Sequence, residues 1–250
     1  MNEQTLKKMK QMKLHGMARS FLGSLESGKA GEYTADELLS MLIESEWDER
    51  YNRKLERTIK GARFRYKASV EQISFDTARQ VEKNQILRIA DCDFINRKEN
   101  VFVTGSTGVG KSYIASALGH QACSLGYKVL YQQSTKLFAR LKLAKADGSY
   151  LKEIARIEKQ DLLIIDDFGL QALDTQSRGT LMEIIEDRHA RASTMVTSQV
   201  PVNKWYEIIG EQTVADAILD RIIHNAHRLE LKGESMRKKG NQILTETTEK

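Results

Sequence analysis

The chain has 250 residues, of which 40% are hydrophobic and 29% are charged, and its formal net charge is +5 at pH 7. This length lies between one and two domains and suffices to bury a proper core, which excludes a single small scaffold. The moderate positive charge favours an anionic partner such as nucleic acid.

Two cysteines, Cys92 and Cys123, have neither metal-ligand spacing nor the number that a disulfide framework needs, which favours a reducing compartment. No apolar run approaches the roughly 18 to 20 residues of a membrane helix, and the charged N-terminus lacks the apolar centre of a signal peptide. We therefore expect a cytoplasmic protein that has no membrane partner.

The first 70 residues are predicted to form a small all-helical domain. Apolar residues recur at spacings of three and four between Leu6 and Leu25, up to a glycine-containing break at residues 28–33. Thr34 and Glu37 then have the form of a capping box, and a second apolar face follows them. We assign residues 1–70 to this N-terminal domain, for DNA binding or oligomerisation, and residues 71–95 to a connecting helical segment.

The continuation of that second helix carries the sharpest charge asymmetry in the chain. Between residues 50 and 67, lysines and arginines are opposed by a single acid, Glu56, and aromatic residues are interleaved. Such a run fits contacts with DNA phosphates, which fix a protein on the duplex without reading its sequence. A solvated helix face is the alternative, and the apolar residues on the other face leave a subunit contact open. The predicted DNA-binding residues are Arg50, Arg53, Lys54, Arg57 and Lys60.

Beyond residue 96 the pattern changes to alternating strands and helices. Short runs rich in β-branched residues at 101–104, 129–131, 162–165 and 194–197 alternate with helical stretches of ten or more residues. This alternation is typical of βαβ units and predicts an α/β domain over residues 96–250, with a parallel sheet flanked by helices.

Residues 105–112 match the phosphate-binding pattern G-x-x-x-x-G-K-[ST] at every fixed position, between a predicted strand and a predicted helix. Glycines let backbone N–H groups turn toward phosphate oxygens, and the positive end of the following helix faces the same charge. Lys111 is predicted to reach the β and γ phosphates of ATP, and Ser112 to bind Mg²⁺; an ordinary glycine-rich turn is the alternative. The predicted nucleotide contacts are Gly105, Ser106, Thr107, Gly108, Val109, Gly110, Lys111, Ser112 and Tyr113.

A magnesium-bound nucleotide also needs a carboxylate at the end of a neighbouring strand. The run 162–165 ends in Asp166 and Asp167, which is a Walker B pattern. Asp166 is predicted to hold Mg²⁺ with its water shell, and Asp167 to orient or deprotonate the attacking water, so we expect ATP hydrolysis. A strand followed by an Asp-rich turn is the alternative.

Two further residues are catalytic candidates. Ser198, preferred over Thr197, follows the fourth predicted strand and could sense the γ-phosphate, although polar residues at strand ends are common. Arg221 lies near the end of an apolar helix over residues 214–223. In an assembly such an arginine can enter the neighbour's site and stabilise transition-state charge; a surface ion pair with Asp220 is the alternative.

Taken in their order, these segments resemble the IstB-like ATPases, the helper proteins of bacterial insertion sequences that encode an IstA transposase. The resemblance covers essentially the whole chain. It rests on residues 100–112, 165–169, 197–201, 220–226 and 228–237, and the last stretch is more specific than the nucleotide-binding motifs.

The resemblance implies an AAA+ P-loop ATPase of the initiator clade, related to DnaC and DnaA. It also implies a homo-oligomer with ATP between subunits, which assembles on double-stranded DNA and recruits and stimulates an IstA-like transposase. A DnaC-like helicase loader is the alternative, since it would share both domains and differ in its partner. Most AAA+ enzymes have glutamate where this chain has Asp167, and the chain is short for a helical lid, so the sensor role of Arg237 is open.

Overall fold

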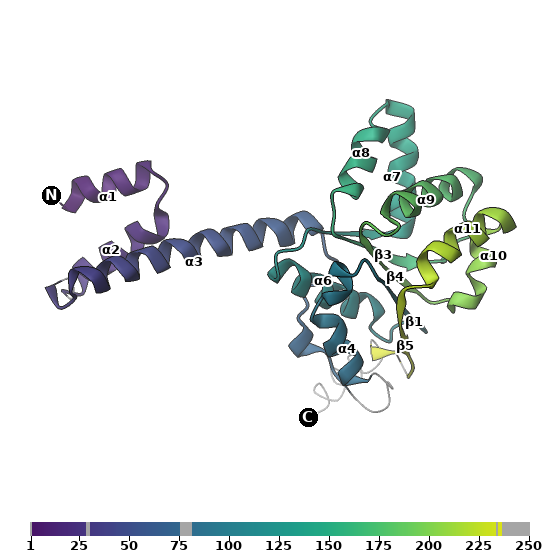
Figure 1. The fold of residues 1–250 in the computed structure, drawn as a ribbon, viewed down its shortest axis with the longest axis horizontal. Coiled ribbons are helices and arrows are strands. Elements are labelled where there is room, and N and C mark those ends of the chain that lie inside the picture. Colours follow the sequence, from purple (N-terminus) through teal and green to yellow (C-terminus); the bar gives the residue numbers. More distant parts are fainter. Residues whose placement is uncertain (1, 29–30, 76–81, 234, 237–250) are drawn as a thin grey trace, which may run out of the picture. The chain divides into compact units, whose positions relative to one another are not determined.

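The computed structural model describes residues 2–28, 31–75, 82–233 and 235–236. The chain divides into two compact units, Met1–Arg57 and Thr58–Lys250. Figure 1 shows their elements in chain order. Arg237, the candidate sensor arginine, lies outside the described residues. Among the described helices, none has both the length and the apolar character needed to cross a membrane.

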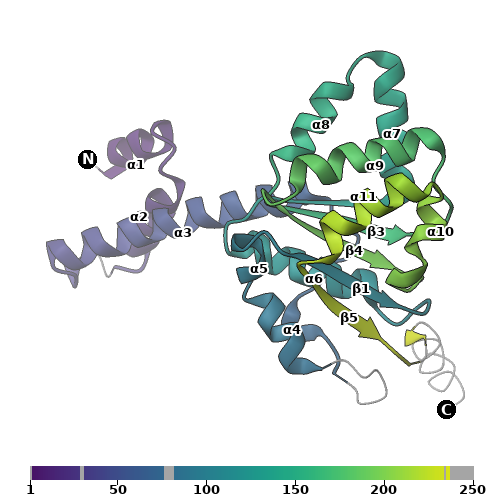
Figure 2. The same ribbon diagram turned by 45° about the vertical axis from the view of Figure 1, so that its right-hand side comes forward.

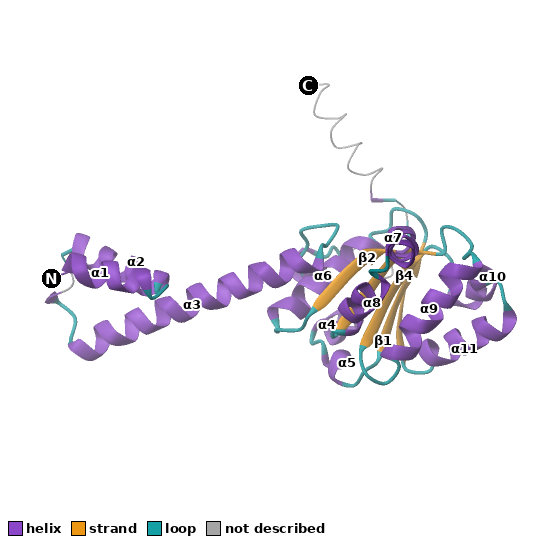
Figure 3. Cartoon of the chain, turned by 90° about the horizontal axis from the view of Figure 1, so that it is seen from above, coloured by secondary structure: helices purple, strands orange, loops and turns teal. Residues whose placement is uncertain are grey.

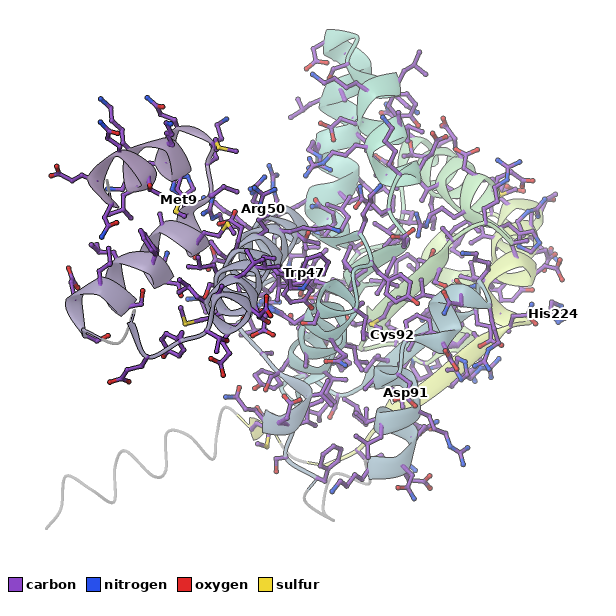
Figure 4. The ribbon with its side chains drawn as sticks, turned by 60° about the vertical axis from the view of Figure 1, so that its left-hand side comes forward. Met9, Trp47, Arg50, Asp91, Cys92 and His224 are labelled. Carbon is purple, nitrogen blue, oxygen red and sulfur yellow. The ribbon has the colours of Figure 1, made fainter. Side chains whose placement is uncertain are left out.

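The first unit is helical, as predicted. It contains α1 (Asn2–Gln11), α2 (His15–Glu26) and most of α3 (Ala35–Ala62), and Figure 4 shows Met9 on the side of α1 that faces α2. The capping box is confirmed, because the Thr34 N–H donates to Glu37 Oε2 at 2.8 Å and the Glu37 N–H donates to Thr34 Oγ1 at 3.3 Å. These bonds satisfy N–H groups that the first turn of a helix leaves without partners.

The interior of the first unit is small and partly polar. A Cβ added at Gly16 of α2 would lie 2.2 Å from the Ser45 carbonyl oxygen of α3, so the two backbones are in close contact. The Gly16 N–H donates to Glu46 Oε2 at 2.8 Å. Burial raises the pKa of Glu46, but hydrogen bonds from Arg50 and from backbone N–H groups outweigh it and keep that pKa below its usual value. Within the described part of this unit, the buried hydrophobic residues are Ala18 and Leu42.

The second unit contains the predicted parallel sheet, seen in Figure 2, with strand order β2-β3-β4-β1-β5. Every neighbouring pair is parallel. The edge strand β5 was not predicted, because its sequence AHRLEL alternates charged with apolar residues and lacks a β-branched run. The strands are β1 (Asn100–Gly105), β2 (Val129–Gln133), β3 (Leu162–Phe168), β4 (Ser193–Ser198) and β5 (Ala226–Leu231).

Helices cover both faces of this sheet, and Figure 3 shows α4 and α6 on one side and α9, α10 and α11 on the other. A core cluster of buried apolar residues joins the strands to the helices α7 to α11. The helices are α4 (Lys83–Ala90), α5 (Asp93–Asn96), α6 (Lys111–Ser124), α7 (Ser134–Asp147), α8 (Tyr150–Glu158), α9 (Thr175–Arg188), α10 (Trp205–Ile209) and α11 (Gln212–Ile223), with short 3-10 turns at Val70–Gln72 and Val202–Lys204.

The division between the units falls within α3, earlier than the position near residue 70 that the sequence suggested. The reason is the packing of the segment after α3 on α6. The Phe64 ring stacks on the His120 ring with centroids 4.3 Å apart, and a Cβ added at Gly119 would lie 2.4 Å from Phe64. Part of the predicted basic run, including Arg65, therefore belongs to the second unit.

Candidate functional site

The phosphate-binding loop joins β1 to α6. Gly108 and Gly110 have φ of +85° and +96°, in the left-handed region that favours glycine. A Cβ added at Gly108 would lie 2.1 Å from the Ser235 hydroxyl oxygen. Lys111 Nζ donates to the carbonyls of Gly105 and Ser106 at 2.9 and 2.8 Å, and the residue is 5% exposed. The loop thus holds the Lys111 ammonium group, and its backbone conformation at Gly108 and Gly110 favours glycine over any larger residue.

The Walker B carboxylate of Asp166 lies directly beside this loop. It is 0% exposed at the end of β3, and Ser112 Oγ donates to its Oδ1 at 2.9 Å. The fold therefore brings together the hydroxyl and the carboxylate that the sequence assigned to Mg²⁺. Two hard oxygen ligands from different elements fit a Mg²⁺ ion that keeps waters and shares the phosphates of a nucleotide.

Two further hydroxyls hold Asp166, and neither was among the predicted site residues. Tyr131 on β2 and Thr197 on β4 each donate a short hydrogen bond to this carboxylate. Burial, followed by the negative charge of Asp166, raises the pKa of Tyr131 well above its ordinary value. The phenol therefore stays protonated and remains a donor, which fixes the orientation of the carboxylate.

Asp167 turns out of the strand that carries it. Its φ is +57°, unusual for a residue other than glycine, and the pairing of β3 with β4 is irregular between Ile165 and Phe168. Its N–H donates to Thr197 Oγ1 at 3.0 Å, which supports this conformation. Residues in this region store about 1 to 3 kcal/mol of strain and cluster at functional sites. The turn directs the Asp167 carboxylate into the cavity beside the loop.

An arginine that sequence reasoning counted only in the basic run reaches both acids. Arg65 NH1 donates to Asp167 Oδ2 at 2.9 Å and lies 3.4 Å from Asp166 Oδ2. Arg65 is 101 residues from Asp166 along the chain, so no local pattern could have indicated the contact. The cation lies where it opposes the same two negative charges that a divalent ion would oppose.

The cavity at this site has a volume of about 390 Å³, within the usual range for small-molecule pockets. Tyr66 and Tyr113 both line it, with ring centroids 6.2 Å apart, and the Tyr113 hydroxyl donates to Gln72 Oε1 at 3.2 Å. Aromatic faces at one part of the cavity suit a nucleobase, and Lys111 and Ser112 suit its phosphates. These residues fit a magnesium-bound nucleoside triphosphate.

At the end of β4, Ser198 is the residue that the sequence favoured as the sensor of the γ-phosphate. The Ser198 hydroxyl donates to the Phe168 carbonyl at 2.7 Å and accepts from the Val200 N–H at 3.0 Å, so its bonds fix a turn. Thr197 makes the contact with Asp166. Gln199 lines the cavity and accepts from Thr107 Oγ1 at 2.6 Å. Thr197, which is 0% exposed, therefore acts through Asp166, and Gln199 is better placed than Ser198 for contact with the reacting groups.

Arg221 lies near the amino ends of β1 and β5, at the opposite end of these strands from the phosphate-binding loop. Its Nε is 2.7 Å from Glu186 Oε2 on α9, whereas Asp220, the partner that the alternative reading suggested, pairs with His224 at 2.9 Å. Arg221 lines a cavity of about 180 Å³ with Asn100 and Asn225. Asn100 is the first residue of β1, and Asn225 directly precedes β5. The phosphate-binding loop follows the opposite end of β1, about 20 Å away for a strand of six residues.

The five predicted DNA-binding residues lie along α3. Two are engaged in ion pairs one helical turn apart, Arg50 with Glu46 and Arg53 with Glu49, both at 2.7 Å. Lys54, Arg57 and Lys60 are exposed. The charge of this face is therefore lower at its N-terminal part than the sequence suggested.

We expect Arg65→Ala to lower the Mg²⁺ concentration needed for half-maximal nucleotide binding by about threefold to tenfold. The physical reason is that Arg65 and Mg²⁺ compete for the same carboxylates, and an ion pair of a partly exposed side chain contributes up to about 1 kcal/mol. Binding of a fluorescent ATP analogue across a Mg²⁺ series measures this. Arg63→Ala, the exposed neighbour, should leave the Mg²⁺ requirement unchanged. An increased requirement would instead identify Arg65 as a ligand of the nucleotide.

The matching family model and similar relatives agree on one family for this chain. The model described as IstB-like ATP binding protein matches residues 7–243. The insertion sequence ATP-binding protein y4pL of Sinorhizobium fredii is 44% identical over 234 residues, which are 94% of this chain and 96% of that protein. The ATP-binding protein of insertion sequence IS21 from Pseudomonas aeruginosa is 29% identical over 243 residues, 96% of this chain and 92% of that protein.

Solved structures confirm the predicted fold class. The crystal structure of DnaI has a TM-score of 0.57 and 22% identity, over 71% of this chain and 94% of that chain. The crystal structure of the DnaC helicase loader has a TM-score of 0.54 and 19% identity, over 67% of this chain and 98% of that chain. At such identities the likeness shows the fold alone. It is an AAA+ core, a parallel sheet flanked by helices, with a helical N-terminal region before it.

Proposed function

This chain belongs to the IstB-like ATP-binding protein family, and we propose that it is an ATPase that assembles on double-stranded DNA and recruits the transposase of an insertion sequence. The observation that carries the proposal is the convergence of Lys111, Ser112, Asp166 and Asp167 at one cavity in a member of this family. The names of its relatives state ATP binding; hydrolysis, DNA and transposase are our inference.

Each of these side chains has a separate task in hydrolysis. Lys111 would neutralise the β and γ phosphates, and Ser112 with Asp166 would hold Mg²⁺, which withdraws charge from the phosphates when it is bound. Asp167 projects into the same cavity and would orient or deprotonate the attacking water. Tyr131 and Thr197 keep Asp166 in place through their hydrogen bonds.

Arg221 would act in the site of a neighbouring subunit. Its place at the end of the sheet opposite the phosphate-binding loop argues against a role in its own site. Arg97 and Lys98 line the same small cavity, so further cations lie beside Arg221, although Arg97 pairs with Glu99 at 3.1 Å. Such an arrangement puts ATP between subunits and makes hydrolysis depend on assembly.

Mixed assemblies test this role. We expect Arg221→Ala and Lys111→Ala chains to be inactive alone and to regain part of the hydrolysis when combined, because some interfaces then pair an intact loop with an intact arginine. Steady-state phosphate release across mixing ratios is the measurement, with mixed assembly verified by differential tagging. If mixed assemblies form and stay inactive, Arg221 acts within its own chain, through its bond to Glu186.

DNA would be held through α3. A helper that accepts many insertion sites should contact the phosphate backbone more than the base edges, and cations on an exposed helix suit that task. The ion pair of Arg53 does not exclude the proposal, since pairs one turn apart on a helix surface contribute only about 0.3 to 0.5 kcal/mol. Arg50 is less available for phosphate, because its partner Glu46 is buried.

We expect Arg53→Ala/Arg57→Ala to reduce the slope of log affinity against log salt concentration by about two, nearly equally for unrelated duplexes. Fluorescence anisotropy of two labelled duplexes in a salt series, with an ATP analogue present, measures the slope. Lys7→Ala/Lys10→Ala removes the same charge from α1 and should leave it unchanged. Equal slopes for both double variants would mean that the protein holds DNA elsewhere.

The transposase is favoured over a helicase as the partner. A relative that matches nearly the full chain at 44% identity is named as an insertion sequence protein, whereas the similarity to helicase loaders is one of fold alone. Co-purification with an IstA-like transposase, and separately with a replicative helicase, distinguishes the two functions. Retention of the helicase only would replace transposition by helicase loading.

A further inference from the structure

A second cavity lies at the carboxyl end of β2, the strand at one edge of the sheet. The last three residues of this strand, 131–133, form part of its wall. Its volume is about 390 Å³, which leaves room for a phosphate group with several waters, since one water takes up about 30 Å³ of the liquid. In open α/β sheets, ligands bind in crevices beyond the carboxyl ends of the strands. The position of this cavity therefore suits a ligand.

The charges around this second cavity favour an anion. Its charged lining residues are three cations, Arg63, Arg65 and Lys136, and one carboxylate, Asp166. Asp166 already accepts a hydrogen bond from Tyr131 and lies 3.4 Å from Arg65. Arg63 and Lys136 are exposed, and within the described part of the chain neither makes an ion pair. The cavity thus has a net positive charge, carried by two cations that an anion can reach from solvent.

The position of Arg63 supports a role for its charge. Arg63 follows the last residue of α3 and has φ of +62°, in the left-handed region where helices usually end with glycine. A residue other than glycine costs about 1 to 3 kcal/mol in such a conformation, and such residues cluster at functional sites. Burial lowers the pKa of Arg140, one turn after Lys136 on α7, and the positive charge of Arg63 lowers it further. Like charges are therefore crowded here, and an anion among them would relieve their repulsion.

Arg65 connects this cavity with the nucleotide cavity, because it lines both. Its NH1 donates to Asp167 Oδ2 at 2.9 Å, and its side chain is 39% exposed, which leaves it room to move. An anion in the second cavity would attract the guanidinium away from the two Walker B acids, and Mg²⁺ beside those acids would repel it. Both ligands favour the same displacement of Arg65, so each should increase the affinity for the other by the same factor.

We propose that the second cavity binds a phosphate group between Arg63 and Lys136, and that this draws Arg65 off the Walker B acids and promotes binding of Mg²⁺ with the nucleotide. The inference rests on the nucleotide site of the proposed function. Two sources supply such a group, the backbone of DNA and free inorganic phosphate. Lys60, exposed three residues before Arg63, would extend the same site along a polyanion.

Nucleotide binding in the presence of inorganic phosphate tests the site. The experiment uses the full chain, a fluorescent non-hydrolysable ATP analogue and a Mg²⁺ series, at constant ionic strength with chloride as the reference anion. We expect phosphate to lower the Mg²⁺ concentration for half-maximal binding by about threefold to tenfold, the change expected for Arg65→Ala. Competition at the phosphate-binding loop, or chelation of Mg²⁺, would raise this concentration instead. A decrease therefore reports the second cavity.

Two variants separate the anion site from the arginine that responds to it. Arg63→Asn/Lys136→Gln removes both cations and should lose the response to phosphate; asparagine tolerates the left-handed backbone at the first position. Arg65→Ala should have a low Mg²⁺ requirement already, and phosphate should lower it no further. The matched control, Lys152→Ala/Lys159→Ala, removes the same charge from exposed positions elsewhere and should respond as the parent does. Melting temperatures verify that each variant is folded.

A DNA duplex in place of inorganic phosphate identifies the source of the group. A response to the duplex that Arg63→Asn/Lys136→Gln abolishes would assign the site to a backbone phosphate, and a response to free phosphate alone would assign it to the ion. A parent that responds to neither, or a folded Arg63→Asn/Lys136→Gln protein that responds as the parent does, would overturn the proposal. Absence of hydrolysis or of assembly on DNA would contradict the proposed function and leave this result intact, because the readout is nucleotide binding.

Discussion

Replacement of Lys111 by alanine is expected to reduce the affinity for ATP about 100-fold or more. The ammonium is held over the loop by the Gly105 and Ser106 carbonyls, which places it for the phosphates before they arrive. Charge-assisted hydrogen bonds contribute about 1.5 to 3 kcal/mol each, and two of them would be lost. Calorimetric titration with a non-hydrolysable ATP analogue measures the change.

The control for this variant is Lys152→Ala, an exposed lysine on α8 in the same unit. It should bind the analogue as the parent does. The melting temperature of Lys111→Ala must also be compared with the parent, because Lys111 is buried. A folded Lys111→Ala protein with unchanged affinity would refute the assignment of the phosphate-binding loop.

Asp167→Asn is expected to keep nucleotide binding and to lower kcat by about 10² to 10⁴, the usual contribution of a general base. The change removes the charge that acts on water and preserves the shape of the side chain. It also suits the backbone, because Asn is one of the few residues that tolerate the left-handed conformation found here, with φ of +57°. Phosphate release at saturating ATP is the measurement.

Asp91→Asn, at an exposed carboxylate after α4, supplies the matched control and should leave turnover unaffected. The interpretation also depends on Arg65, which would keep a neutral hydrogen-bond acceptor in place of Asp167. Turnover equal to that of the parent would exclude Asp167 as the base. The attacking water would then have to be oriented by another cavity residue, and Gln199 is the best placed.

The sequence by itself determined the phosphate-binding loop, the acidic strand end and the alternation that makes a parallel sheet. These features are local. The loop is a run of eight residues whose glycines dictate its backbone, and the capping box acts over three residues. The family resemblance is likewise carried by contiguous stretches, so it could be read before any fold was known.

Only the tertiary structure decided which side chains surround the Asp166 carboxylate. Tyr131, Thr197 and Arg65 are 35, 31 and 101 residues away from it, and they meet because β2, β3 and β4 end side by side and the segment after α3 packs on α6. The tertiary structure also decided between Thr197 and Ser198. Successive residues of a strand point to opposite faces, so the register of β4 against β3, with its irregularity, selects the hydroxyl that reaches Asp166.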